Sequence, residues 1–168
     1  MRIIVSDASC LIDLQRDHIL EVFLELPFEF VIPDVIFDDE LVSFTRVEKA
    51  LLRKHMTIAG LDGDGVTRVS EILIQAPALS VHDGFAFVVA EENPGSILLT
   101  GDRRLRNLAE SEEIEVHGVL WVIQQLDIHK QATRKQRLTA LEIWRDDPAC
   151  RLPPNALGRM IARLQRSS

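Results

Sequence analysis

Two aspartates lie directly after short apolar runs that are typical of buried strands. Asp7 follows the run RIIVS, and Asp102 lies just past the run SILLT. If both runs are parallel strands, both carboxylates lie at the carboxyl end of the sheet, which is where open parallel sheets bind their ligands. We therefore expect Asp7 and Asp102 to meet over one site.

Two further acids are placed to join this pair. Asp83 lies at the start of the helix predicted before SILLT, and Glu40 lies early in the helix predicted after FEFVIP. Several buried carboxylates in one place repel one another and take up protons, unless a divalent cation compensates their charge. Oxygen ligands suit Mg²⁺ or Mn²⁺, and one or two such ions can promote phosphodiester hydrolysis. The four acids therefore predict a metal-dependent nuclease site.

The apolar spacing along the chain predicts strands that alternate with helices. The predicted strands are RIIVS, FEFVIP, MTIAGL, SILLT and IEVHGVLW. The predicted helices are SCLIDLQRDHILEVFLEL, DVIFDDELVSFTRVEKALLRKH with Asp34 as its N-cap, VTRVSEILIQA after a DGDG turn, SVHDGFAFVVAEEN, RRLRNLAESEE, WVIQQL, TRKQRLTALEIW and NALGRMIARLQ. Such alternation forms βαβ units, so we expect a three-layer α/β/α sandwich with a central, mainly parallel sheet.

The length and the charge distribution predict one domain with a basic helical extension. A chain of 168 residues suits a single compact domain. Nine Lys or Arg against three acids give residues 129–168 a charge of +6, which leaves −13 on residues 1–128 out of a total of −7. We place a nuclease-like domain at 1–128 and a basic C-terminal extension, packed on it, at 129–168. Bound cations would reverse the field that a phosphate meets at the acidic body.

Several other classes of protein are disfavoured. Cys10 and Cys150 form no Cys-x-x-Cys pair, which indicates neither a disulfide framework nor a thiolate zinc site. The low cysteine content suits a reducing cytoplasm. No run approaches the roughly 18 apolar residues needed to cross a bilayer, so we expect a soluble protein. No Gly-x-Gly-x-x-Gly follows the first strand, which disfavours dinucleotide binding. Ser9 stands where haloacid-dehalogenase-like phosphatases need a second aspartate.

The order of the motifs resembles that of a known family. The stretches VSDASCLIDL, VIPDVIFDDEL, LSVHDGFAFVVAEE, ILLTGDRRLRNLAE and IEVHGVLWVIQQL look like the successive motifs of PIN-domain proteins. The resemblance runs from Arg2 to about Leu126, and the closing RLPPNALGRMIARL is similar to the tail of one bacterial PIN branch. It implies an endoribonuclease dependent on Mg²⁺ or Mn²⁺, often the toxin of a VapBC-type toxin–antitoxin pair and often a dimer.

The resemblance also implies roles for particular residues. The catalytic metal ligands that it implies are Asp7, Glu40, Asp83 and Asp102. Ser9 and Thr100 match positions where the family often has a hydroxyl, and they would orient the ligands. Gly84 stands where the family commonly has alanine. The run of acids at 38–40 leaves the identity of the second ligand open between Asp38, Asp39 and Glu40.

Three arginines follow Asp102 and a histidine precedes Asp83, and for each we weigh a functional and a structural interpretation. Arg103, Arg104 and Arg106 could contact RNA phosphates, and a solvated helix face explains them almost equally well. The five histidines show no metal-ligand spacing, so we expect His82 to be a surface or hydrogen-bonding residue rather than a ligand.

The expected partners are an RNA substrate, a second copy of the chain and, if the chain is a toxin, an antitoxin protein, with no membrane. Two other functions stay open beside the toxin. One is a stand-alone RNA-processing nuclease. The other is a non-catalytic module that keeps the PIN fold and binds a partner.

Overall fold

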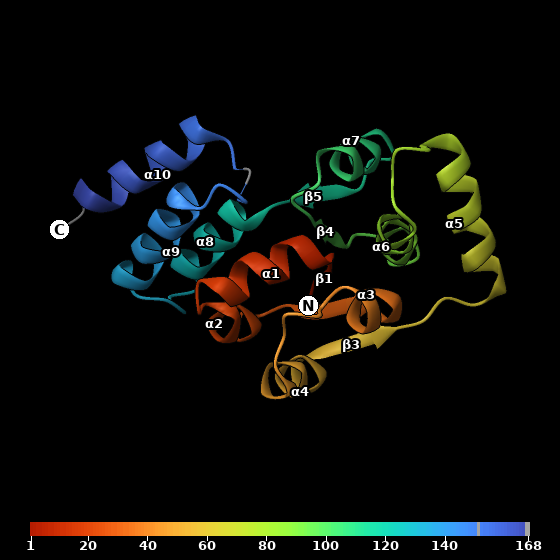
Figure 1. Cartoon of the computed structure of the whole chain (residues 1–168), viewed down its shortest axis with the longest axis horizontal. Helices are drawn as coiled ribbons and strands as arrows, with labels where there is room; N and C mark the ends of the chain where they lie inside the picture. Colours follow the sequence, from red (N-terminus) through yellow and green to blue (C-terminus); the bar gives the residue numbers. More distant parts are fainter. Residues whose placement is uncertain (151, 167–168) are drawn as a thin grey trace. The chain divides into compact units, whose positions relative to one another are not determined.

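A computed structural model describes residues 1–150 and 152–166, and its central feature is a five-stranded parallel sheet (Figure 1). The strands are β1 (Ile3–Ser6), β2 (Glu29–Pro33), β3 (Met56–Ala59), β4 (Ile97–Leu99) and β5 (Glu115–His117). Their order is β3-β2-β1-β4-β5, and each neighbouring pair is parallel. Helices flank this sheet, so the predicted α/β/α sandwich is confirmed.

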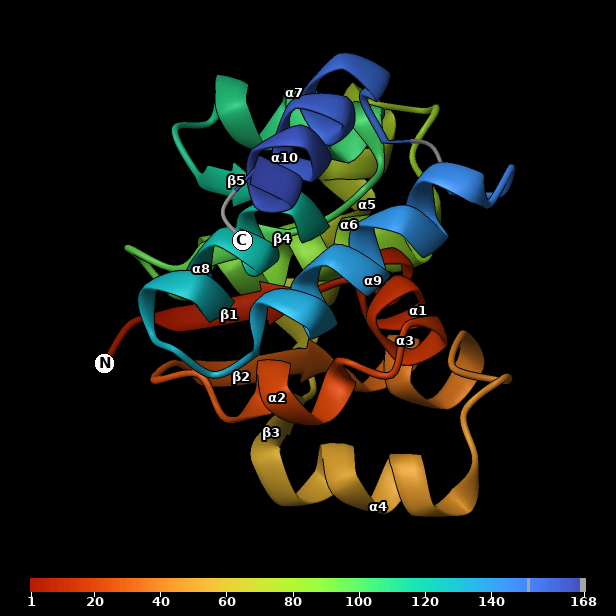
Figure 2. The same ribbon diagram turned by 90° about the vertical axis from the view of Figure 1, so that its left-hand side faces the viewer.

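Helices connect each strand to the next, as the βαβ pattern predicts. They are α1 (Ala8–Arg16), α2 (Leu20–Leu24), α3 (Asp34–Asp39), α4 (Arg46–His55), α5 (Gly63–Gln75), α6 (Val81–Glu91), α7 (Arg103–Ser111), α8 (Val119–Ile128), α9 (Arg134–Asp146) and α10 (Pro154–Arg166). Figure 2 shows β1, β2 and β3 in succession, with α4 beside β3. Among the described residues, none of these helices is long and apolar enough to span a membrane.

The strand order places a topological switch point between β1 and β4. From β1 the chain adds β2 and β3 on one side, and it then returns to add β4 and β5 on the other side. Connections therefore diverge from β1 and β4, and at such a point open parallel sheets bind ligands in a crevice beyond the carboxyl ends of the strands. The inner strands are apolar on both faces, and Ile4, Val5, Leu98 and Leu99 are fully buried. This burial fixes the register that carries Asp7 to the crevice.

Two predicted helices are each divided in the structure. The segment after β1 forms α1 and α2, because His18 takes a left-handed backbone conformation (φ 58°) that no helix can continue through. The segment after β2 forms α3 and α4, and Thr45 starts α4 in a capping box with Glu48. The apolar spacing ran through both breaks, so it could not mark them.

Several predicted boundaries shift by a few residues. The N-cap of α3 is Pro33 rather than Asp34, and Asp34 is instead the first helical residue. The predicted DGDG turn belongs largely to α5, because Asp62 caps that helix and Gly63 begins it. Strand β5 ends at His117, so the segment predicted to extend it already belongs to α8.

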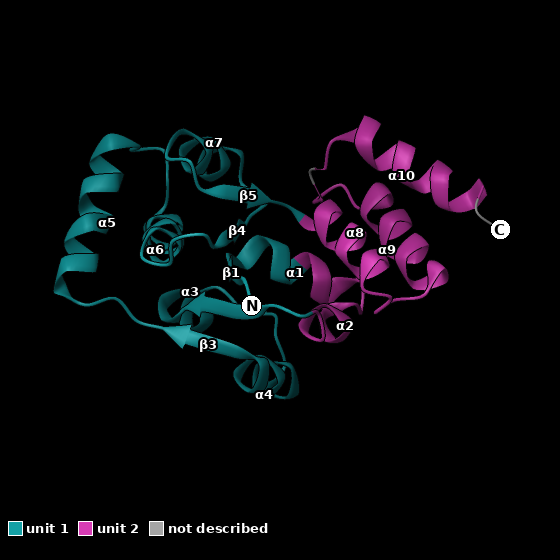
Figure 3. Ribbon diagram, turned by 180° about the vertical axis from the view of Figure 1, so that it is seen from behind, with its two compact units in different colours: residues 1–12, 27–118 teal, residues 13–26, 119–168 magenta. Residues whose placement is uncertain are grey.

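The chain forms two compact units, which Figure 3 colours separately. Unit 1 comprises residues 1–12 and 27–118 and contains the whole sheet, whereas unit 2 comprises residues 13–26 and 119–168. This division groups α8 with the C-terminal helices in unit 2, and the domain boundary after residue 128 stays a prediction. The packing of the extension on the nuclease-like domain stays a prediction.

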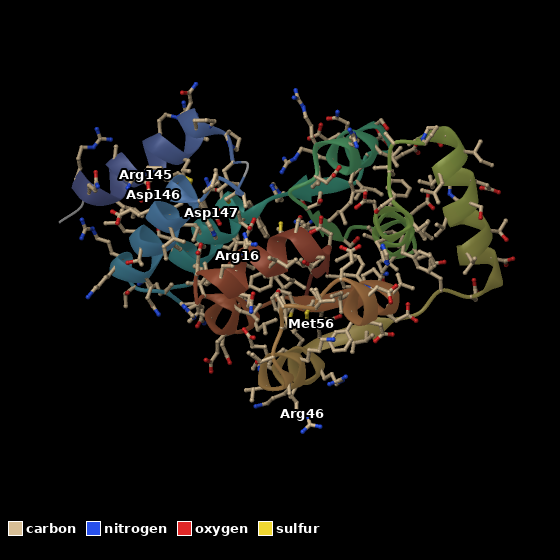
Figure 4. All side chains as sticks on the ribbon, viewed as in Figure 1. Arg16, Arg46, Met56, Arg145, Asp146 and Asp147 are labelled. Atoms are coloured by element: carbon tan, nitrogen blue, oxygen red, sulfur yellow. The ribbon has the colours of Figure 1, made fainter. Side chains whose placement is uncertain are left out.

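Unit 2 has its own buried contacts. Trp144 is buried and donates its indole N–H to the carbonyl of Asp13 (3.4 Å), which joins α9 to α1. Nearby, Arg16 pairs with Asp147 at 3.3 Å, and both are labelled in Figure 4.

Asp17 is only 5% exposed, and neither of its carboxylate oxygens has a hydrogen-bond partner in the described part of the chain. Burial, with repulsion from Asp13 and Asp147, raises the pKa of Asp17 to about 7.

Asp17→Asn should stabilise the protein at alkaline pH. The folded pKa of Asp17 lies above its unfolded pKa. Its contribution to the free energy of unfolding is therefore fully present below about pH 4, and it is lost as the pH rises through 7. We expect the variant to gain on the order of 2 kcal/mol over the parent at pH 8, and much less at pH 4. Urea unfolding at both pH values measures this difference, and the exposed Asp64→Asn is the control. A variant less stable than the parent at pH 8 would contradict the assignment.

Candidate active site

Asp7 lies at the centre of the predicted crevice. It follows β1 directly, and because Ser6 pairs with Leu99, Asp7 lies next to Thr100 at the end of β4. The Asp7 N–H donates to the Leu99 carbonyl (3.1 Å), so the pairing of the two strands continues into the site. The side chain is 4% exposed. Sheet register therefore determines where this carboxylate points.

Two hydroxyl groups hold the Asp7 carboxylate and connect it to the loop after β4. The Ser9 hydroxyl lies 2.8 and 2.9 Å from its two oxygens, and the Thr100 hydroxyl donates a short hydrogen bond to Oδ2. Each hydroxyl also accepts a backbone N–H, from Gly101 at Ser9 (3.0 Å) and from Asp102 at Thr100 (3.0 Å). Ser9 and Thr100, the positions predicted to orient the ligands, thus each connect the backbone of the loop to the Asp7 carboxylate.

Burial makes the Asp7 charge expensive. Loss of hydration raises the pKa of Asp7 to about 6, although Thr100, Ser9 and the Cys10 N–H all stabilise the ionised form, and the negative charge of Asp83 raises it further. No cationic side chain is among the causes of the shift. A carboxylate that is buried, hydrogen-bonded and without a counter-charge is suited to a cation.

Glu40 and Asp83 approach from α3 and α6. Glu40 is the C-cap of α3, at the end of a short helix rather than early in a long one as predicted. Ser80 is the N-cap of α6, and Asp83 is its capping-box partner, with its carboxylate accepting the Ser80 N–H at 3.1 Å. Burial raises the pKa of Glu40, and repulsion from Asp83 and Asp39 adds to the effect.

His82 links the two acids at the end of α3, a role that its sequence spacing did not reveal. Its Nδ1 lies 3.0 Å from Glu40 Oε1, and its Nε2 lies 3.0 Å from Asp39 Oδ2. The prediction of a hydrogen-bonding residue fits this contact. Only its position beside Asp83, in the first turn of α6, could have suggested that it faces the site.

Asp102 caps the next helix. One of its carboxylate oxygens accepts the N–H groups of Arg104 (2.9 Å) and Leu105 (3.0 Å), and this starts α7. The other oxygen takes no part in these hydrogen bonds. Asp102 reaches Asp7 indirectly, because its own N–H binds the Thr100 hydroxyl that holds Asp7.

The arginines of α7 lie beside this loop. Arg106 donates to the carbonyl of Thr100 (3.5 Å), and Arg104 donates to the carbonyl of Ala78 (3.4 Å). Both contacts are long and leave hydrogen-bonding capacity for another group. A role for these residues and Arg103 in binding RNA stays a prediction.

The structure brings the four predicted acids to one edge of the sheet, but they are not grouped for metal binding. Asp83 is electrostatically coupled to both Asp7 and Glu40, whereas Asp102 joins through Thr100. Within the described residues, no three His, Cys, Asp or Glu side chains are arranged to hold a metal ion. The caps that engage Asp83 and Asp102 account for part of this spread. Their assignment as ligands stays a prediction.

The packing around Gly84 explains why glycine stands where the family commonly has alanine. A Cβ at this position would lie 3.0 Å from Cγ1 of Val69 and 3.5 Å from Cδ2 of Leu73. The glycine therefore allows α5 and α6 to pack closely at the turn that carries Asp83.

A family model described as a PIN domain matches residues 3–166. This chain belongs to the PIN-domain family. Among curated proteins, none matches the chain. PIN domains are generally nucleases and typically use divalent metal ions, so the PIN fold of this chain is of a nuclease type.

Asp7→Asn should stabilise the metal-free protein at alkaline pH. The folded pKa of Asp7 lies above its unfolded value. The contribution of Asp7 to the free energy of unfolding is therefore greatest below about pH 4 and is lost as the pH rises through 6. Removing the charge should recover up to about 3 kcal/mol at pH 8 in EDTA, and little at pH 4. Chemical unfolding of both proteins at both pH values measures the gain. Equal stability at pH 8 would show that this charge is not costly.

Proposed function

We propose that this PIN-domain protein is an endoribonuclease that depends on Mg²⁺ or Mn²⁺. The observation that carries the proposal is the buried Asp7 carboxylate, which lies at the switch point of the sheet and is coupled to a second acid. Membership of a family whose members are generally nucleases supports hydrolysis of a phosphodiester. The choice of RNA as substrate rests on the resemblance of the motifs.

The donor set suits a hard divalent cation. Asp7, Glu40, Asp83 and Asp102 would hold it, and all four offer carboxylate oxygens. Asp7 fits best, because its raised pKa shows a charge that lacks compensation. Asp83 and Asp102 each keep one carboxylate oxygen outside their capping hydrogen bonds. When bound, the ion would supply Lewis acidity toward the scissile phosphodiester.

The side chains around the acids orient their carboxylates. Ser9 and Thr100 donate to Asp7 and accept the N–H groups of Gly101 and Asp102, so these hydrogen bonds tie the orientation of the carboxylate to that loop. His82 contacts Glu40 from the first turn of α6 and thereby limits where this carboxylate can point. Losing such an orienting group typically lowers metal affinity or activity by about 10- to 100-fold.

The finer biological role is also a proposal. The family resemblance supports a cytoplasmic toxin of a VapBC-type pair that acts as a homodimer and is held by an antitoxin. A stand-alone nuclease would have the same acids and the same chemistry. A short neighbouring reading frame with a DNA-binding pattern would favour the toxin.

A second candidate function is a PIN-fold module that binds a partner without cleaving RNA. One observation favours it: no three of the acids among the described residues form a ready metal site, and Asp83 and Asp102 are engaged in helix caps. The two candidates differ in whether a divalent ion can draw the acids together. Titration of the metal-free protein with Mn²⁺, followed by calorimetry, measures this directly.

Cleavage of RNA should require both the ion and the central acids. We expect EDTA to abolish cleavage of a labelled RNA and Mn²⁺ or Mg²⁺ to restore it. Asp7→Asn and Asp102→Asn should reduce the rate by at least about 100-fold, since each loses a charge that the ion needs. The exposed Asp64→Asn is the matched control. If both site variants cleave as fast as the parent, the proposed active site is wrong.

Glu40 should prove to be the ligand among the three consecutive acids at 38–40. Glu40 is coupled to Asp83, whereas Asp38 is exposed and Asp39 contacts the His82 nitrogen that does not bind Glu40. We expect Glu40→Gln to lower the affinity for Mn²⁺ by about 10-fold or more, and Asp38→Asn to change it little. A comparable loss of Mn²⁺ affinity in Asp38→Asn would show that Asp38, rather than Glu40, is the ligand.

A further inference from the structure

Helix α4 presents a concentration of positive charge on an acidic body. Its ten residues contain four Lys or Arg side chains, against the single acid Glu48, in a part of the chain, residues 1–128, whose net charge is −13. The four, which we call the α4 cations, are Arg46, Lys49, Arg53 and Lys54.

The α4 cations take no part in the salt bridges of the described residues. No acidic side chain of the described residues lies within 4.0 Å of any of them, and the carboxylate of Glu48 accepts the Thr45 N–H at the start of the helix (2.9 Å). Arg46, Arg53 and Lys54 are exposed, and Figure 4 shows Arg46 extending outward from α4. Their charge is therefore available to a ligand without breaking an ion pair.

Two of these cations are held in place by an aromatic ring. Lys49 Nζ lies 5.2 Å and Arg53 Cζ lies 4.8 Å from the ring centroid of Phe37, which is 2% exposed. Placing two like charges on one ring costs repulsion, and an anion between them would relieve it. The ring limits the motion of both side chains, so less entropy is lost when they bind a ligand.

This arrangement lies beside the candidate active site, in the same unit. Phe37 belongs to α3, and Glu40 caps that helix less than one turn further on, about 4.5 Å along its axis. Two of the α4 cations therefore contact the helix that ends at Glu40. An acidic body repels a polyanion, so a substrate phosphate needs local positive charge to approach.

We propose that α4 binds the phosphate backbone of the RNA substrate next to the acids. This inference rests on the proposed ribonuclease function and adds the surface that holds the substrate. The requirement for positive charge beside a phosphodiester site favours RNA over an acidic protein segment, because a protein partner would need no proximity to the acids. Nothing in the sequence spacing of α4 suggested this role, since its cations are typical of a solvated helix face.

The test uses the full chain in EDTA, which prevents cleavage and isolates binding. A fluorescein-labelled single-stranded RNA is titrated at several salt concentrations, and anisotropy gives its affinity. The α4 variant is Arg46→Gln, Lys49→Gln, Arg53→Gln and Lys54→Gln combined. The matched control removes four exposed cations of unit 2: Lys130→Gln, Lys135→Gln, Arg159→Gln and Arg166→Gln.

The α4 variant should lose affinity and salt dependence together. Each lost phosphate contact lowers the slope of log K against log salt by about 0.7 for a single strand, so we expect the slope to fall by roughly 2 to 3. The control should keep most of its slope. Equal losses in both variants would overturn the proposal, since they would reflect net charge alone. An unchanged slope in the α4 variant would overturn it too.

Two further arms keep the result interpretable. If the fourfold variant does not fold, the pair Arg46→Gln and Lys54→Gln, which leaves the Phe37 contacts intact, should give about half the change in slope. In a cleavage assay with Mn²⁺, the α4 variant should raise KM and leave kcat nearly unchanged. A loss of affinity for a polyglutamate peptide but not for RNA would overturn the proposal and make α4 a protein-binding surface.

Failure of this inference and failure of the proposed function give different results. If the parent binds RNA through α4 but does not cleave it with Mn²⁺, the nuclease assignment fails and the binding surface stands. If the parent cleaves and the α4 variant binds RNA like the parent, only the present inference fails.

Discussion

The site depends on one interaction, the burial of the Asp7 carboxylate beneath the hydroxyls of Ser9 and Thr100. Those hydroxyls come from the first turn after β1 and from the end of β4, so the carboxylate joins the two strands from which the connections diverge. The hydrogen bonds favour its ionised form, while burial opposes it more strongly. The same group that secures the sheet edge therefore has an uncompensated charge there.

That conflict is typical of residues kept for function rather than for stability. A neutral side chain could fill the same space, but it would not attract a cation. The neighbouring acids Asp83 and Asp102 also accept backbone N–H groups at the starts of the helices that begin at the site. Capping fixes the backbone, and it leaves one oxygen of each carboxylate for another partner. The site thus combines one buried charge without a counter-charge, on Asp7, with two carboxylates, on Asp83 and Asp102, that also start helices.

The sequence was sufficient for those features that depend on periodicity. The continuous apolar runs predicted the strands, and the acids at their ends predicted the edge at which Asp7 and Asp102 would lie. It was insufficient where a single backbone conformation decides. His18 divides α1 from α2 through a left-handed φ that histidine adopts without a sequence signal. Glu40 was placed early in a helix and lies at its end, since the break before Thr45 interrupts no apolar pattern.

The composition of unit 2 has a consequence for synthesis of the chain. Its two segments, residues 13–26 and 119–168, come from opposite ends of the sequence. At about 5–20 residues per second, roughly 5 to 20 s separate their emergence from the ribosome. Leu14 and Phe23, fully buried in the finished protein, must wait that long for the helices that cover them. The nascent chain can complete its sheet while these apolar side chains are still open to chaperones or to aggregation.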